Sequence, residues 1–156
     1  MNSKRLKSLI KTAKDLTIKN GEHGTIILIE DNKGAMFVVK PIWENDEQKY
    51  KIINEVKEML KNPRFKSYLF ISESWFVSRK VGDPINVKAS QQDDRQETLA
   101  ITYVERTGKK KFLMLPFTRV IDEKGKSIIT FDKDTEFRSD DPKVMISSIW
   151  DNLFNP

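Results

Sequence analysis

The sequence has no cysteine and only one histidine, His23. Without cysteine the chain cannot form disulfides, thiolate metal sites or a cysteine nucleophile. A single histidine in the turn-like segment GEHG, with no second histidine to share a ligand, is typical of an ordinary loop residue. The sequence therefore predicts neither a metal site nor a cofactor.

Long hydrophobic runs are also missing. No segment approaches the roughly 20 consecutive apolar residues of a membrane-spanning helix. Residues 1–21 lack the apolar block and the small-residue cleavage site of a secretory signal. No repeat, low-complexity segment or linker divides the chain. Its 156 residues, 38% hydrophobic and 33% charged, predict a soluble single domain over residues 1–156, located in the cytoplasm.

The net charge of +5 comes entirely from residues 1–20, which carry six basic residues against Asp15. Apolar residues recur there at helical spacing, and lysines occupy the opposite side of the helix. The apolar residues are Leu6, Leu9, Ile10, Ala13 and Leu16, and the lysines are Lys4, Lys7, Lys11 and Lys14. Asn2 or Ser3 is the expected N-cap, and Asn20-Gly21 the expected end. We interpret the segment as a core-packing helix with a solvated basic face. A contact with nucleic acid and a helix lying on a membrane surface remain alternatives.

Two strands, residues 25–30 and 35–40, flank the turn-type sequence DNKG and predict a hairpin. The segment NDEQ (residues 45–48) resembles a capping box and opens a second predicted helix, which ends before Asn62-Pro63. The remaining predicted strands cover residues 69–79, 97–105, 111–121 and 127–131, with an exposed loop at 81–94. A closing helix is expected after Pro142.

The predicted element order is α-β-β-α-β-β-β-β-α. This order favours an α+β fold in which an antiparallel sheet carries its helices on one face or at one end.

A carboxylate interrupts the apolar alternation of the strand LFISESWFV (residues 69–77) at Glu73. If the turn at Gly108 has three residues, Glu97 lies opposite Arg119 and Leu99 opposite Phe117. If the loop between the preceding strands closes symmetrically about Ile85, Glu73 lies opposite Glu97 and Trp75 opposite Arg95. A charged cluster of Glu73, Arg95, Glu97 and Arg119 is then expected on the inner face of the sheet.

A buried carboxylate without a partner is costly, so arginines from neighbouring strands explain why Glu73 is tolerated. We interpret the cluster as a charge network that fixes strand register. The alternative is acid–base catalysis by the paired carboxylates Glu73 and Glu97. No histidine, glycine-rich phosphate loop or serine elbow accompanies these carboxylates.

Two short segments, SESW (residues 72–75) and DRQETL (residues 94–99), are similar to motifs of a known group of proteins. The region 69–125 resembles uncharacterised small proteins of bacteriophages, mobile elements and bacteria, which share a Ser-Glu-x-Trp strand and a later Asp-Arg-x-Glu-x-Leu strand. The resemblance implies no activity. It implies a phage- or virus-encoded protein, located in the host cytoplasm or in the virion.

Three functions follow as hypotheses. The leading one is a non-enzymatic accessory protein that binds another protein; a homo-oligomer is compatible with it. The second is nucleic-acid binding through basic residues of the first helix and of the turn before residue 111. Its candidate residues are Lys4, Lys7, Lys11, Lys14, Lys109, Lys110 and Lys111. The third is a hydrolase-type enzyme that uses Glu73 and Glu97.

Overall fold

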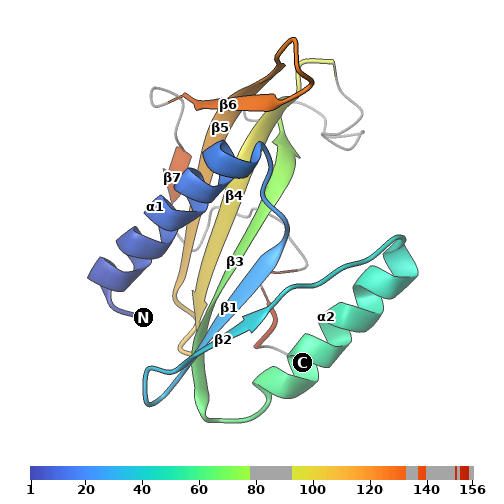
Figure 1. The fold of residues 1–156 in the computed structure, drawn as a ribbon. Helices are drawn as coiled ribbons and strands as arrows, with labels where there is room; N and C mark the ends of the chain where they lie inside the picture. Colours follow the sequence, from blue (N-terminus) through green and yellow to red (C-terminus); the bar gives the residue numbers. More distant parts are fainter. Residues whose placement is uncertain (78–92, 133–136, 140–149, 151, 155–156) are drawn as a thin grey trace, which may run out of the picture.

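The computed structural model describes residues 1–77, 93–132, 137–139, 150 and 152–154 (Figure 1). It contains the helices α1 (Ser3–Asn20) and α2 (Asp46–Leu60). Its strands are β1 (Ile26–Asp31), β2 (Met36–Val39), β3 (Phe65–Phe76), β4 (Gln96–Glu105), β5 (Lys110–Ile121), β6 (Ser127–Phe131) and β7 (Phe137–Ser139).

The strands form one antiparallel sheet in the order β2-β1-β3-β4-β5-β6. The short strand β7 pairs with the beginning of β5, at Phe112, Leu113 and Met114. Strand β7 was not predicted. The predicted α+β class and antiparallel sheet are confirmed.

Both helices begin and end at residues that satisfy free backbone groups. The Asn2 side chain accepts a hydrogen bond from the Arg5 amide, and Gly21 ends α1 in the left-handed conformation, both as predicted. The Asn45 side chain accepts from the Gln48 amide at the start of α2. Gln48 Oε1 accepts from the amide of Glu44, one residue before the cap, so the predicted capping box forms in a shifted version.

The helices cover opposite faces of the sheet rather than one face or end, which corrects the expected packing. Successive residues of β3 explain why. Tyr68 and Phe70 pack in the core beneath α2, whereas Leu69 and Ile71 pack in the core beneath α1. Because side chains alternate between the two faces of a strand, the continuous apolar run 68–71 requires a cover on both sides.

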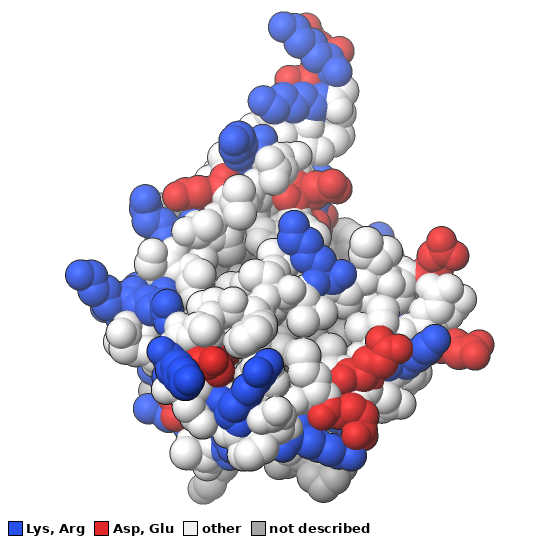
Figure 2. All heavy atoms as spheres, turned by 60° about the horizontal axis from the view of Figure 1, so that its bottom comes forward, with Lys and Arg blue, Asp and Glu red and all other residues white. Residues whose placement is uncertain are grey.

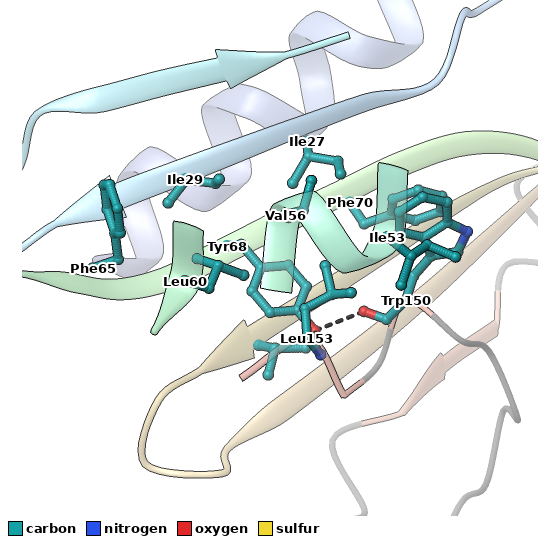
Figure 3. Close-up of a cluster of buried hydrophobic side chains, with 11 residues drawn as sticks. Ile27, Ile29, Ile53, Val56, Leu60, Phe65, Tyr68, Phe70, Trp150 and Leu153 are labelled. Atoms are coloured by element: carbon teal, nitrogen blue, oxygen red, sulfur yellow. Dashed lines mark hydrogen bonds between the residues drawn. The ribbon is translucent and has the colours of Figure 1, made fainter. Parts of the chain in front are cut away.

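The core beneath α2 also holds residues from the end of the chain (Figure 3). The Trp150 ring stacks on Phe70 with centroids 4.6 Å apart. The buried Tyr68 hydroxyl donates to the Trp150 carbonyl at 2.6 Å and accepts from the Leu153 amide at 3.3 Å. Trp150 and Leu153 belong to the predicted closing helix, but most of that helix, including Pro142, lies outside the described residues.

Other predicted boundaries differ by small amounts. Strand β3 begins at Phe65, four residues before the predicted start at residue 69. The prediction missed these residues because Lys66 and Ser67 interrupt the apolar pattern. Its predicted end at 79 and nearly all of the loop at 81–94 lie outside the described residues.

Candidate functional site

The candidate site lies where β3, β4 and β5 reach the end of α1. The structure pairs Glu73 with Leu99 and Trp75 with Glu97. It pairs Glu97 with Phe117. Both predicted registers are therefore wrong by two residues. Because an even shift keeps every side chain on its face, the predicted charges still share one face of the sheet.

Arg119 holds both predicted carboxylates. Its Nη2 donates to Glu73 Oε2 at 2.6 Å, and its Nε donates to Glu97 Oε1 at 3.1 Å. Arg119 lies two residues beyond Phe117, so it is the diagonal neighbour of Glu97 and reaches across β4 to Glu73. The three side chains are 22–26% exposed. The network thus lies at the margin of the core and contacts solvent.

The same network fixes the connection between α1 and β1. Glu73 Oε1 accepts from the His23 amide at 2.7 Å, and Arg119 Nη1 donates to the Gly21 carbonyl at 2.8 Å. Glu73 therefore caps a backbone amide and pairs with an arginine. The sequence did not predict these contacts with the His23 amide and the Gly21 carbonyl, because the pattern of side chains does not show where backbone groups lie.

Arg95 takes a different position from the one predicted. Its guanidinium lies over the indole ring of Trp75, 4.7 Å from the centroid. Arg95 precedes Gln96, the first residue of β4, so no ladder pairing directs its side chain toward the carboxylates. The predicted group of four charges thus becomes a triad of Glu73, Glu97 and Arg119 beside an arginine–tryptophan pair.

The electrostatics of the triad favour a permanently charged arginine. Burial by itself lowers the pKa of Arg119, but the hydrogen bonds and charges of Glu73 and Glu97 more than offset it, so the pKa lies above its ordinary value. Two carboxylates and one guanidinium give the triad a formal charge of −1.

The triad borders a hollow of about 420 Å³ that is also lined by Ser74 and Trp75. The Trp75 side chain is 41% exposed. Each oxygen of Glu73 and both oxygens of Glu97 accept hydrogen bonds within the network. The His23 ring hydrogen-bonds through Nδ1 with the Gly24 carbonyl. With both carboxylates held by Arg119, the arrangement is suited to fixing β3, β4 and the α1–β1 connection in place.

Comparison of the chain with models of protein families, with curated proteins and with solved structures finds no match. The resemblance carried by SESW and DRQETL therefore stays a prediction.

The structure divides the predicted nucleic-acid-binding lysines among several environments. Lys4, Lys7 and Lys11 are exposed on α1, although Lys11 is 3.6 Å from Asp15. Lys14 lies over the Phe131 ring, 4.9 Å from its centroid. Lys110 donates to Asn152 Oδ1 at 2.7 Å, on the side of the sheet away from α1, and Lys109 is exposed.

Lys7 and Lys111 line one pocket, so the two predicted basic segments meet in space. Figure 2 shows charges of both signs on the end of the molecule that lies lowest in Figure 1, with basic side chains predominating on the side of α1. Within the described residues, no helix has the length and apolar character to cross a membrane.

Proposed function

We propose that this protein is a non-enzymatic accessory protein that binds another protein through a surface centred on Trp75. The observation that carries the proposal is the large exposed fraction of Trp75, 41%, in a hollow bordered by fixed charges. Tryptophan and arginine are the residue types most enriched among the residues that dominate binding energy at protein interfaces.

The surroundings of Trp75 fit a preformed contact surface. Arg95 covers one part of the indole, and the Arg119 triad holds the neighbouring charges in place before any partner arrives. Ile121, two residues from Arg119 and on the same face of β5, is 58% exposed. An apolar centre with a polar border is the usual anatomy of such interfaces. The resemblance described above extends the proposal to a phage or virus protein acting in the host cytoplasm or the virion.

Affinity capture with matched variants tests this proposal. Wild-type protein, Trp75→Ala and Ile42→Ala serve as bait in the same lysate; Ile42, 84% exposed in the connection between β2 and α2, provides the control. A captured protein is then purified and its affinity is measured by calorimetry. We expect Trp75→Ala to weaken binding at least tenfold and Ile42→Ala to leave it unchanged. Equal affinity for all three baits, with circular dichroism showing intact folds, would rule out the Trp75 surface.

Nucleic-acid binding is the second candidate, because Lys4, Lys7 and Lys11 are exposed along α1 and Lys111 lies beside Lys7. Phosphate contacts predict that log affinity falls linearly with log salt concentration. Charge reversal at Lys4 and Lys11 should weaken binding of a mixed-sequence oligonucleotide and reduce this slope. Absence of a gel shift at low salt would eliminate the candidate.

A further inference from the structure

A pocket of about 250 Å³ lies between α1 and strands β4, β5 and β7, apart from the Trp75 surface. Its deepest walls are apolar. Ile101, Tyr103 and Leu113 are 2–7% exposed and form the sheet side of the pocket. Leu6 and Ile10 of α1 line it and are only half-buried. Within the part of the chain that the structure describes, the packing of α1 on the sheet therefore leaves apolar surface uncovered here.

The outer part of the pocket is cationic. Lys7 of α1 and Lys111 of β5 both line it, and Lys7 is exposed while Lys111 is half-buried. No ion pair is found for either lysine among the described residues. Ser3 and Ser139 add hydroxyl groups to the lining. Two lysines thus line the same pocket as several apolar side chains, a combination that suits a ligand with an anionic head and an apolar tail.

Tyr103 is the most buried polar residue among the described lining residues, and its hydroxyl is already hydrogen-bonded. The Tyr103 hydroxyl donates to Glu105 Oε1 at 2.8 Å and accepts from the Met1 ammonium at 2.8 Å. Tyr103 therefore offers its ring to the pocket, and Glu105 is engaged by the hydroxyl. Among the described residues that line the pocket, the charged ones are the two lysines, so this lining favours an anion.

We propose that this pocket binds an aliphatic carboxylate of medium chain length, with its alkyl chain between α1 and β4–β5 and its carboxylate between Lys7 and Lys111. The volume sets the size. Its volume of about 250 Å³ lies just below the roughly 300–1,000 Å³ of typical small-molecule sites, which favours a small ligand. Octanoate matches this volume with its carboxylate at the surface.

Octanoate is the probe, and its binding is followed by calorimetry and by chemical-shift changes at methyl groups of Ile101 and Leu113. Acetate tests the need for the chain, and octanol the need for the charge. The matched variants are Lys7→Gln/Lys111→Gln and Lys4→Gln/Lys109→Gln, because both pairs remove one lysine from α1 and one from the β4–β5 region. We expect the first pair to weaken octanoate binding at least tenfold and the second to change it less than twofold.

Three outcomes would overturn the proposal. Acetate that binds as tightly as octanoate would indicate a surface ion only. Octanoate that binds both double variants equally would exclude the two lysines. An oligonucleotide that binds through Lys7 and Lys111, while octanoate does not bind, would assign these lysines to a polyanion. Ile10→Phe, which reduces the volume, should abolish octanoate binding; if this variant does not fold, the lysine pairs still decide.

Discussion

Arg119 connects three segments that are distant in the sequence: β3 through Glu73, β4 through Glu97 and the α1–β1 linker through Gly21. Hydrogen bonds to charged groups each contribute about 1.5–3 kcal/mol, and a partly buried charge left without its partner is destabilising. We expect Arg119→Met to lower the free energy of unfolding by about 2–3 kcal/mol, as measured by urea denaturation.

Arg95→Met is the matched control for Arg119→Met, since Arg95 lies on the exposed ring of Trp75. Its effect on stability should be smaller than that of Arg119→Met, because Arg95 lies outside the triad and does not join β3 to β4 and β5. Equal losses in the two variants would show that the triad contributes no special stability.

The environment of Glu30 indicates how the free energy of unfolding should depend on pH at acidic pH. Burial raises its pKa, but the Met1 ammonium at 2.7 Å, Ser67 and Arg5 more than offset this, so the pKa of Glu30 lies below its ordinary value. Lys66, 3.6 Å away, adds another positive charge. A lowered folded-state pKa stabilises the protein above the unfolded-state pKa of about 4.3, and this stabilisation is lost as pH falls through the folded-state value.

Wild type should therefore be more stable than Glu30→Gln at pH 7, and the difference should shrink as pH falls below about 4.3. Urea denaturation of both proteins between pH 7 and pH 3 measures this difference. A gap of constant size over the whole range would contradict the role assigned to the Glu30 charge.

At the scale of elements, the end of α1 is fitted closely against β6. Gly21 has a φ of +74°, and a Cβ added there would lie 2.6 Å from Ser127 Cβ. Gly125, in the β5–β6 turn, has a similar φ of +76° but no atom within 4 Å of an added Cβ. Alanine at either position would carry the cost of a left-handed residue, about 1–2 kcal/mol. Only at position 21 would its Cβ also collide with a neighbour.

Gly21→Ala should therefore lower the thermal unfolding midpoint clearly more than Gly125→Ala does. Scanning calorimetry of the two variants measures the difference, in which the shared backbone cost cancels. Equal midpoints would mean that α1 shifts away from Ser127 with little loss of stability.

At the scale of the whole molecule, β3 supplies side chains to both cores and should make unfolding cooperative. Leu99→Ala removes a fully buried side chain beneath α1 and should lower the free energy of unfolding by about 2–5 kcal/mol. Trp43 and Trp150 lie in contact beneath α2 and report on the other core. In a Trp75→Phe background, Leu99→Ala should shift the unfolding transition followed by their fluorescence and the transition followed by far-ultraviolet circular dichroism by the same amount. Separate transitions would contradict the predicted single domain.

Much of this architecture is readable from the sequence because it rests on local rules. The caps Asn2, Gly21 and Asn45 and the helical stripes depend on residues only a few positions apart. The placement of the helices was not predicted, because the apolar run 68–71 requires cover on both faces of β3 but does not identify the elements that provide it. Strand β7 is too short for an alternation pattern to identify it.

In the candidate site, too, some features were predictable from the sequence and others were not. The pairing of Arg119 with Glu73 and Glu97 was predicted even though both registers were wrong, because side-chain facing survives a two-residue shift. The position of Arg95 was not predictable, since it lies outside the ladder. The pocket between α1 and the sheet depends on how closely two elements approach, which no local pattern encodes.

The sharing of β3 between two cores also limits how the chain can vary. Tyr68, Leu69, Phe70 and Ile71 are each at most 6% exposed, so none has a side chain free to accept a polar replacement. Natural variants should retain four consecutive apolar residues here while the flanking turns diverge. Such a block, read in a newly sequenced genome, would mark a strand that is covered on both faces.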